Sequence, residues 1–329
     1  MLSFLFLLGL HIACHGSIIP DFVTLNKDSE KYFYFPGDGD NLLHFVNIEE
    51  TVDVKFIEEL TRGPRKYSYW LFTRENPTTP NILIYEDTES ILESNFSKHK
   101  DTVFLVHGWF GNGVNEMNLM LTDAFLKDGD VNVIVLDWSS LATKNYVTAK
   151  RGVPVLGESL GDFIRWLNMM DVSFDKIHLV GFSLGAHLVG NAGRTVGGQV
   201  KRITGLDPAG PLWRNDENKL RRTDALYVEV IHTNAALYGI TETCGDVDFY
   251  PNGGSSMPGC WFNVCSHSKG YEYMAASVLH DHLVGNECDD IEHAYNDECF
   301  GEVYPMGNSD LKKFRSGIFR VNTGKVFPF

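Results

Sequence analysis

KIHLVGFSLGAHLVGNAG, residues 176–193, joins an apolar run to a Gly-x-Ser-x-Gly motif and a helical pattern rich in small residues. The apolar run from Ile177 to Val180 predicts a strand, and the motif then places Ser183 on a tight, strained turn. The flanking glycines let the backbone cross itself at this turn without a Cβ clash. This strand–turn–helix context is typical of a nucleophile elbow, so Ser183 is the candidate nucleophile.

A second Gly-x-Ser-x-Gly match, residues 157–161, is an internal control for the first. The sequence before Ser159 is AKRGVPVL, which contains a proline and no clean strand pattern. The sequence after it spaces Phe163, Trp166 and Met170 as an amphipathic helix does. We therefore expect Ser159 to lie early in a helix and not to act as a nucleophile.

The composition limits the class of protein. At 329 residues the chain can bury a sizeable core, and its contents of 43% hydrophobic and 22% charged residues are ordinary for a globular protein. The net charge of −15 argues against nucleic-acid binding and against electrostatic docking on anionic lipid. No apolar run reaches membrane-spanning length, and the whole is compatible with a soluble secreted enzyme.

The N-terminus, MLSFLFLLGLHIACHG, resembles a secretory signal peptide. Its apolar segment runs from about Leu2 to Leu10, and small residues between Ala13 and Ser17 suit cleavage. No Lys or Arg precedes that segment, so a buried N-terminal strand is the alternative. We expect residues 1–16 to be a signal peptide and the mature protein to be secreted and extracellular.

A secreted protein can be glycosylated and can form disulfides. The tripeptide Asn95–Ser97 is an N-glycosylation sequon, so Asn95 is the expected glycan site. Of six cysteines, Cys14 would leave with the signal peptide, and an odd number would remain. The parsimonious pairs, each closing a short loop, are Cys260–Cys265 and Cys288–Cys299. Cys244 then has no evident partner.

Strand-like runs recur from Tyr67 onward, with helical patterns at 114–127, 157–170 and 184–196 between several of them. The runs are YSYWLFT, NILIYED, DTVFLVHG, VNVIVLDW, KIHLVGFS, RITGLDP and ALYVEVIHT. Several are continuously apolar, as strands buried on both faces should be. The alternation predicts an α/β fold with a largely parallel sheet. Residues 17–65 carry no usable motif, and the ending GIFRVNTGKVFPF leaves no room for a second domain, so we expect a single domain over 17–329.

A serine nucleophile needs a base to take its proton and a third group to orient that base. Asp207 follows the strand in GLDPAGP and so lies at the carboxyl edge of the sheet, although an Asp-Pro pair can also simply start a turn. His267 comes two residues after a cysteine, on an expected loop past the last strong strand. The alternatives are His232, which could be a core histidine, and the pair His280 and His282 in an ambiguous stretch.

The tetrahedral intermediate of ester hydrolysis needs two backbone N–H donors. The residue after the nucleophile, Leu184, supplies one. The stretch FLVHGWFGNG supplies a strand followed by a glycine-rich turn, and the Trp109 amide is the candidate for the second donor. We expect His107 to order this turn rather than to react.

The motifs HGWFGNG, GFSLGAH, GLDPAGP, VIHTN, DFYPNGG, MPGC and CSHSKGYEYM occur in this order. Together they closely resemble the catalytic domain of the pancreatic lipase family of animal triglyceride lipases and phospholipases, over about residues 60–329. The resemblance implies an α/β-hydrolase fold. It also implies these roles: Ser183 as nucleophile, Asp207 as acid, His267 as base, and Trp109 and Leu184 as oxyanion donors. Non-catalytic yolk-protein relatives have lost the serine, whereas this chain keeps all three triad residues.

The expected lid is short. In the lipases of this family a disulfide closes a much longer lid, whereas the matching segment here, Cys260–Cys265, has four residues between its cysteines. The loop after VIHT is also short, and both features resemble the family's phospholipases A1 and insect gut lipases. Trp261 and Phe262 at the lid tip either insert into a lipid interface, where aromatic rings are favoured, or pack on the disulfide and roof the site.

The resemblance also bears on metals and partners. The family's calcium site falls near residues 216–224, where Asp216 and Asp224 match acidic positions but Arg221 replaces a usual aspartate. A cation there would repel calcium, and no C-x-x-C pair flanked by histidines suggests zinc, so we expect no metal and no cofactor. The C-terminal β-sandwich domain of larger members has no counterpart, so no protein cofactor is expected.

The function expected from these features is the hydrolysis of carboxylic esters of lipids at a lipid–water interface. Loop length favours release of the sn-1 fatty acid from phospholipids, as by a phospholipase A1. Triacylglycerol, galactolipid or general ester hydrolysis is the alternative within enzymes. A non-catalytic lipid-binding protein of the yolk type is the alternative from another class.

Overall fold

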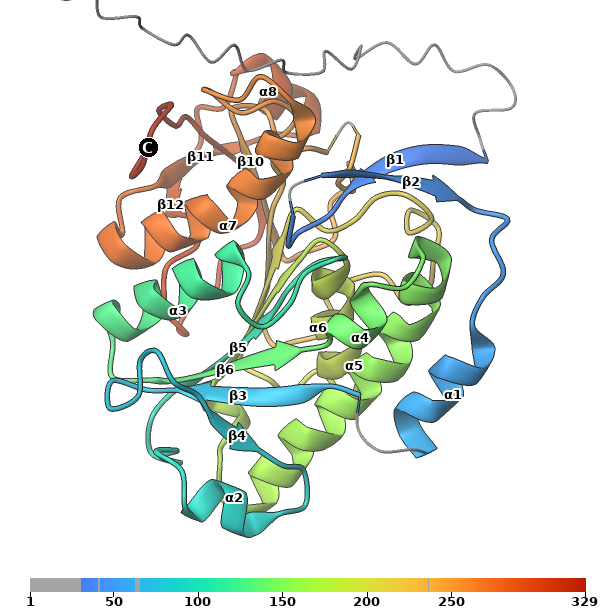
Figure 1. Ribbon diagram of the computed structural model, residues 1–329. Coiled ribbons are helices and arrows are strands. Elements are labelled where there is room, and N and C mark those ends of the chain that lie inside the picture. The colour runs from blue at the N-terminus through green and yellow to red at the C-terminus, as the bar shows by residue number, and fades with distance from the viewer. Residues whose placement is uncertain (1–30, 41, 63–65, 236) are drawn as a thin grey trace, which may run out of the picture.

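The structure, a computed structural model, describes residues 31–329 except 41, 63–65 and 236 (Figure 1). The signal peptide expected at residues 1–16, with Cys14, lies outside the described residues. Within the described ranges no helix is long and apolar enough to cross a membrane.

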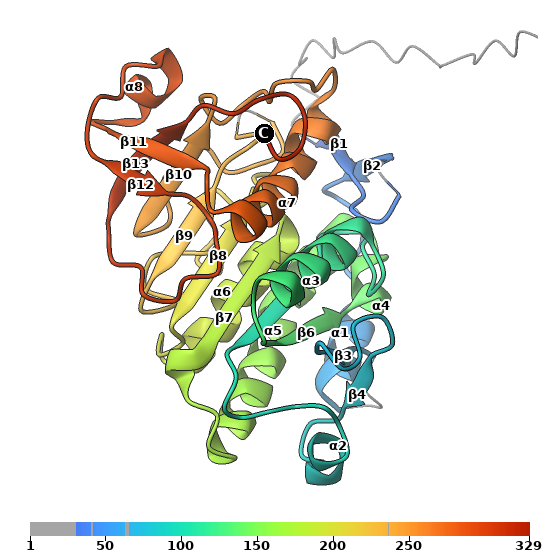
Figure 2. The same cartoon turned by 90° about the vertical axis from the view of Figure 1, so that its left-hand side faces the viewer.

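A large central sheet forms the middle of the molecule (Figures 1 and 2). Its strands are β3 Ser68–Phe72, β4 Asn81–Leu83, β5 Thr102–Val106, β6 Asn132–Asp137, β7 Ile177–Phe182, β8 Arg202–Leu206, β9 Val228–Ile231, β10 Val247–Pro251, β11 Val284–Cys288, β12 Val303–Pro305 and β13 Gly317–Val321. They lie in the order β12-β11-β13-β10-β9-β8-β7-β5-β6-β3-β4. Neighbours from β13 to β6 are parallel, and the pairs at both edges are antiparallel.

The expected α/β-hydrolase fold with a largely parallel sheet is confirmed. Each of the seven strand-like runs contains one strand of this sheet. Every residue of β5, β7, β8 and β9 is buried, as the apolar run of β5 predicts, and the charged residues of β8 and β9, Arg202 and Glu229, pair with each other in the core. The C-terminal ending also contributes, because β13 pairs with β10 on one side and β11 on the other.

Helices cover both faces of the sheet (Figure 2). Side chains of α5 (Tyr146–Met169) and α6 (Leu184–Thr195) share an apolar cluster with one face of β5 and β6, and α1 (Val54–Arg62) packs on α5. Side chains of α3 (Glu116–Asp128) and α7 (Asn263–His280) share a second cluster with the opposite face. The short helices are α2 Thr88–Leu92, α4 Ser139–Ala142 and α8 Ile291–Asn296, with a 3₁₀ turn at Phe174–Lys176.

Helix α5 begins at Tyr146, earlier than the sequence predicted, and it continues through Pro154. Ser159 lies in the middle of this helix, where its Oγ donates a hydrogen bond to the Val155 carbonyl, 3.2 Å away. It is remote from any turn after a strand. The expectation that Ser159 is a helical residue is confirmed, although it does not lie early in the helix.

A separate antiparallel hairpin, β1 (Tyr32–Pro36) and β2 (Leu43–Asn47), lies over the carboxyl edge of the sheet (Figure 1). The sequence had suggested no element here. Phe35 points inward and is fully buried, and its ring contacts those of Trp109 and His267. The hairpin therefore packs directly on the candidate site.

Both expected disulfides are present, Cys260–Cys265 and Cys288–Cys299. Cys244 is a free, buried thiol, and its burial raises its pKa well above the usual value. A thiol held protonated in this way is a poor nucleophile, so Cys244 is a core residue.

Candidate active site

Ser183 occupies the sharp turn between β7 and α6. Its backbone has φ 55° and ψ −118°, a conformation that L-residues rarely adopt, and its side chain is buried. A Cβ on Gly181 would lie 2.3 Å from the Gly185 carbonyl oxygen, and a Cβ on Gly185 would lie 2.2 Å from the Val106 oxygen. Both glycines of the motif are therefore required by close backbone approach, and the expected elbow geometry is present.

Asp207 and His267 form a buried pair. The ring Nδ1 of His267 lies 2.5 Å from Asp207 Oδ2. The other carboxylate oxygen accepts hydrogen bonds from the amides of Thr233 and Asn234, at 2.8 and 2.9 Å. These donors fix the carboxylate in direction, and a proton on Nδ1 leaves Nε2 of the ring as a proton acceptor.

The sequence had suggested that His267 lies on a loop, but the structure places it on a helix. It lies just after the start of α7, which begins at Asn263 directly after the exposed lid residues. The residues that follow bury Tyr271, Met274 and Val278 at helical spacing, and this apolar face fixes the helix on the sheet. A base on a packed helix is held more firmly than one on a loop.

Ser183 and His267 lie together at the carboxyl edge. The ring of Phe182, beside the serine, packs on the ring of His267 with centroids 4.6 Å apart. Ser183 N donates to the Leu206 carbonyl, directly before Asp207, at 3.0 Å. Ser183 Oγ and His267 Nε2 are both buried, and neither has a hydrogen-bond partner among the described residues. Buried polar atoms without partners are uncommon, and these two include the donor and the acceptor of the proton that the proposed reaction would transfer.

The turn after β5 lies against the elbow. A Cβ on Gly108 would come within 3.1 Å of the Ser183 Cβ. Neither Trp109 N–H nor Leu184 N–H donates a hydrogen bond to any group of the described residues. Leu184 is the first residue of α6, so its amide also lies at the positive end of a helix dipole. Two free amides beside the serine suit a developing oxyanion.

Comparison with known proteins agrees with this geometry. A family model described as Lipase matches residues 46–317, which is most of the chain. This chain belongs to the pancreatic lipase family. It is 33% identical over 261 residues to pancreatic lipase-related protein 2 of Mus musculus, covering 70% of this chain and 54% of that protein. It is 31% identical over 299 residues to pancreatic triacylglycerol lipase of Sus scrofa, covering 79% and 66%.

Pancreatic lipase-related protein 2 of Bos taurus is 35% identical over 261 residues, with 70% of this chain and 56% of the relative covered. The chain thus spans just over half the length of the first of these pancreatic lipase relatives. The match ends at residue 317 and begins at residue 46, so β1 and the start of β2 precede it.

The other candidate histidines have structural partners. His232 is fully buried between Asp248 Oδ1, 2.8 Å from its Nε2, and the Ile240 carbonyl, 3.0 Å from its Nδ1. His280 and His282 lie at and beyond the end of α7, and His282 contacts the Pro328 carbonyl. The core-histidine alternative for His232 is therefore correct, which leaves His267 as the candidate base.

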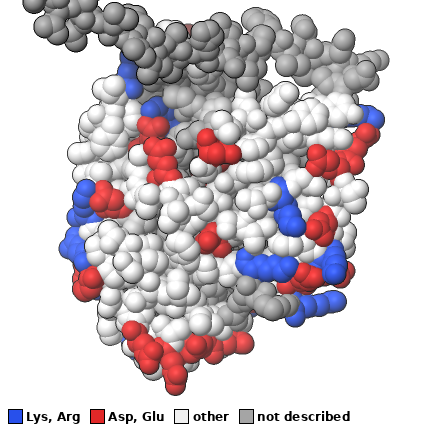
Figure 3. Space-filling model, viewed as in Figure 1, with Lys and Arg blue, Asp and Glu red and all other residues white. Residues whose placement is uncertain are grey.

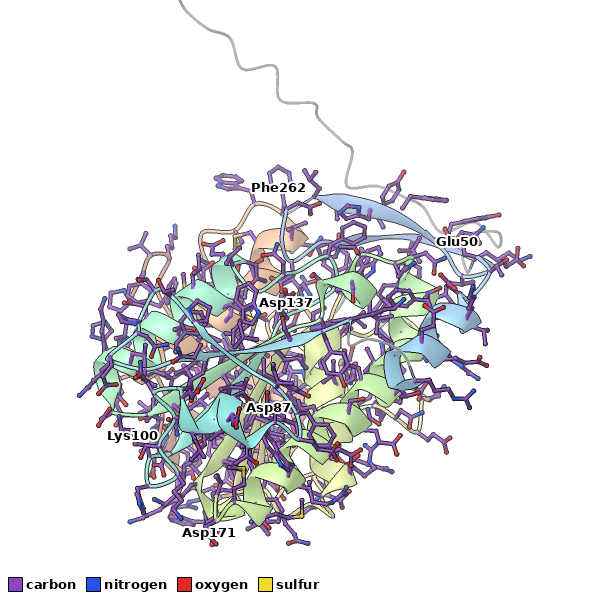
Figure 4. The ribbon with its side chains drawn as sticks, turned by 60° about the horizontal axis from the view of Figure 1, so that its bottom comes forward. Glu50, Asp87, Lys100, Asp137, Asp171 and Phe262 are labelled. Carbon is purple, nitrogen blue, oxygen red and sulfur yellow. A yellow bond between two sulfur atoms is a disulfide. The ribbon has the colours of Figure 1, made fainter. Side chains whose placement is uncertain are left out.

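The lid projects outward from the molecule. Trp261 and Phe262 lie between the cysteines of the Cys260–Cys265 disulfide, and their side chains are 88% and 65% exposed. Phe262 points away from the protein beside the β1–β2 hairpin (Figure 4). Of the two expectations for these rings, packing on the disulfide to roof the site is wrong.

The acidic residues at the family's calcium position are paired with cations of the chain. Arg194 contacts both carboxylate oxygens of Asp224, at 3.0 and 2.9 Å, and Lys150 pairs with Asp216. Burial raises the pKa of Asp224 to about 6, against the opposing pull of Arg194. The described residues contain no group of three or more His, Cys, Asp or Glu side chains suited to a metal ion.

The surface charge is uneven. On the face in Figure 3, acidic side chains gather at the bottom, over α2, while basic side chains are scattered at both sides. The distribution agrees with the net charge of −15, and the visible face has no extended cationic surface.

Proposed function

We propose that this protein is a secreted carboxylic ester hydrolase that acts on lipids through Ser183, His267 and Asp207. The observation that carries the proposal is the buried His267–Asp207 pair beside a serine held on a strained turn. A strained backbone persists only where the surrounding structure supports it, and here it holds a buried hydroxyl that has no hydrogen-bond partner among the described residues.

The mechanism follows from the partners of each atom. Ser183 Oγ attacks the ester carbonyl while His267 Nε2 takes its proton, and the imidazolium then protonates the leaving alcohol. Asp207 holds the ring with Nδ1 protonated and stabilises the cation that forms. The amides of Trp109 and Leu184 bind the oxyanion, and water releases the fatty acid by the same steps.

Several features support a secreted protein with one α/β domain over residues 17–329. The sequence of residues 1–16 resembles a signal peptide, and two disulfides are of the kind found in oxidising compartments. Asn95 is exposed on the segment between α2 and β5, and its Nδ2, which would carry the glycan, donates a hydrogen bond to Asn76 Oδ1 at 3.0 Å. The protein can be expressed in a eukaryotic host and its mass compared before and after endoglycosidase treatment. Secretion, together with a mass decrease on treatment that is absent in Asn95→Gln, would support this assignment.

Phospholipase A1 action is the favoured specificity. The Cys260–Cys265 lid encloses four residues and offers little apolar area with which to cover the site. A lid this short would leave room at the entrance for a lipid with a bulky polar head group, and the exposed rings of Trp261 and Phe262 suit a lipid interface. Triacylglycerol or galactolipid hydrolysis at an open site is the alternative.

Labelling with a fluorophosphonate separates an enzyme from a non-catalytic lipid-binding protein of the yolk type. We expect rapid, stoichiometric labelling that is lost in Ser183→Ala and retained in Ser159→Ala. Absence of labelling in the folded wild-type protein would remove the enzyme proposal. Release of sn-1 fatty acid from phosphatidylcholine vesicles, measured beside a triglyceride emulsion, then tests the specificity.

The lid rings can be tested separately from the chemistry. Trp261→Ser with Phe262→Ser removes apolar area that would enter the lipid, worth about 25 cal/mol per Å². We expect about tenfold slower hydrolysis of vesicles and unchanged hydrolysis of a short soluble ester. Equal loss on both substrates would show that the rings act on the site and not at the interface.

A further inference from the structure

Asp38 is a buried carboxylate that the proposed reaction does not yet use. It follows β1 in the sequence Pro-Gly-Asp-Gly-Asp, in the turn of the β1–β2 hairpin, and is only 8% exposed. It lies before residue 46, where the lipase family match begins. A buried carboxylate is costly unless its oxygens are hydrogen-bonded, so its partners identify its role.

Among the described residues, Asp38 makes two hydrogen bonds, both to the turn that carries the proposed oxyanion donor, while its Oδ1 is buried without a partner. Its Oδ2 accepts from the Gly108 amide at 2.6 Å. Its own amide donates to the Trp109 carbonyl at 2.7 Å. Asp38 therefore holds the peptide before and the peptide after the one that bears the Trp109 N–H.

The remaining groups of these three peptides also have partners. Trp138 Nε1 donates to the His107 carbonyl at 3.0 Å, and Phe110 N donates to the Ala142 carbonyl at 3.0 Å. In the middle peptide, the Gly108 carbonyl accepts from His107 Nδ1 at 2.9 Å and from the Gly111 amide at 3.1 Å.

Of the six backbone polar groups in these peptides, only Trp109 N–H has no partner among the described residues. In a trans peptide the N–H points opposite to the C=O, so holding the Gly108 carbonyl from behind aims the Trp109 N–H forward. The two flanking peptides must also be fixed, since rotation of either one would turn the middle peptide. Asp38 has a bond to each.

We propose that Asp38 is a positioning residue that orients the Trp109 amide toward the oxyanion by binding both neighbouring peptides. The inference rests on the proposed function and extends it to a residue of the hairpin. It gives the hairpin a part in catalysis: β1 brings to the elbow a carboxylate that α5, α6 and the central sheet do not supply.

The surroundings hold the Asp38 side chain closely. A charge-assisted bond from an amide is shorter and stronger than a neutral one, and the 2.6 Å contact fits that class. A Cβ on Gly111 would lie 2.9 Å from Asp38 Oδ2, so the turn closes tightly around the carboxylate. Burial raises the pKa of Asp38, while the His107 ring and the Gly108 amide oppose that rise.

The test compares Asp38→Ala with Asp40→Ala. Asp40 lies in the same turn but is exposed, and its carboxylate contacts only His44 and the Leu42 amide. On a short soluble ester we expect Asp38→Ala to lower kcat by about 10- to 100-fold with KM within twofold, since a mispositioned donor costs less than a deleted one. Asp40→Ala should match the wild type.

The second readout is the rate constant of fluorophosphonate labelling per folded molecule. In that reaction Ser183 Oγ bonds to phosphorus, fluoride leaves, His267 takes the proton, and the phosphoryl oxygen needs the same amides as the oxyanion. We expect this rate constant to fall with kcat in Asp38→Ala. Wild-type kcat and labelling per folded molecule would overturn the inference, as would lost activity explained by lost folded protein.

Should Asp38→Ala not fold, Asp38→Asn takes its place. Its amide oxygen can still accept from Gly108 N–H but without the charge, so we expect a smaller, at least threefold, fall in labelling rate; a wild-type rate overturns the inference. The wild-type protein keeps the two proposals apart, because its failure to label would remove the proposed function itself.

Discussion

The chain contains two segments with the same five-residue pattern, Gly-x-Ser-x-Gly, at 181–185 and 157–161, and they do different work. In the first, the glycines let strand, turn and helix cross, and the serine is strained and unpartnered. In the second, the glycines let two helices touch: a Cβ on Gly157 would lie 2.5 Å from Asn191 Cβ, and one on Gly161 would lie 2.5 Å from Thr195 Cβ.

The difference teaches how little a short motif determines. Glycine is required at all four positions because neighbouring atoms approach too closely for a Cβ. Only the backbone conformation of the serine separates the two: Ser183 has a positive φ, while Ser159 is helical and bonds to its own helix. The backbone conformation of the turn, and not the five-residue pattern, therefore distinguishes the candidate nucleophile from the helical serine.

The largest expected difference is in activity. Ser183→Ala should lower ester hydrolysis by at least about 10⁴-fold, since the nucleophile is lost while the fold remains. Ser159→Ala should leave kcat unchanged, because that hydroxyl bonds only to Val155. Hydrolysis of a soluble ester measures both activities, and an equal loss of activity in the two variants would show that the two serines do not differ in role.

A second difference concerns the glycines. Gly185→Ala would place a methyl group 2.2 Å from the Val106 oxygen and 2.5 Å from the His107 oxygen. We expect a cost of about 3 kcal/mol in the free energy of unfolding, and a loss of activity per folded molecule because the oxyanion turn is displaced.

Its matched control is Gly157→Ala, whose methyl group would meet Asn191 Cβ and the Leu188 oxygen between α5 and α6. Stability should again fall, by about 2 kcal/mol, but activity per folded molecule should be kept. Urea denaturation and active-site titration together give both quantities. Activity lost in Gly157→Ala and kept in Gly185→Ala would reverse our assignment.

The smallest effect has opposite signs at the two serines. Ser183→Gly should relieve backbone strain of about 1–3 kcal/mol, because glycine adopts a positive φ freely. Glycine also costs about 0.5–1 kcal/mol in backbone entropy, so the inactive variant should be more stable by about 1 kcal/mol. Ser159→Gly should lose about 0.5 kcal/mol of helix propensity. Thermal melting measures both, and a lower melting temperature for Ser183→Gly would count against strain at the elbow.

The sequence predicted the parts of the fold that are locally unambiguous. The buried parallel strands have long apolar runs, and the ends of β7 and β8 carry Ser183 and Asp207 where parallel strands should place them. The pairing of Asp207 with His267 follows the expected order of the triad. The strands and Ser183 needed only the period of the hydrophobic pattern and the position of turns, whereas the choice of Asp207 and His267 rested on the resemblance to the lipase family.

Other features could not be predicted because their local signals conflict. The hairpin has aromatic residues on both faces, with Phe33 and Phe35 inward and Tyr34 and Phe45 outward, so no alternation of apolar and polar residues marks its strands. Asp38 was missed with it. Only the fold shows that this carboxylate meets a turn seventy residues away.

The boundaries of two helices were not predicted because the sequence there contains features that usually interrupt a helix. Pro154 concealed the first half of α5, although a helix already packed on the sheet tolerates one proline. The disulfide before His267 suggested a loop, whereas helix α7 starts within it, and the helical spacing of Tyr271, Met274 and Val278 was the signal that would have placed the base.

Helix α7 begins inside the disulfide loop and contains His267 just over one turn further on. The exposed tip directly precedes this helix, with Phe262 as its N-cap residue, and the buried face of the helix packs on the sheet. Because the disulfide ties the tip to the first turns of α7, a large movement of the tip would also displace the imidazole from Asp207. Under the proposed function, the entrance therefore keeps its shape during turnover, and hydrolysis of a short soluble ester should not require a lipid interface.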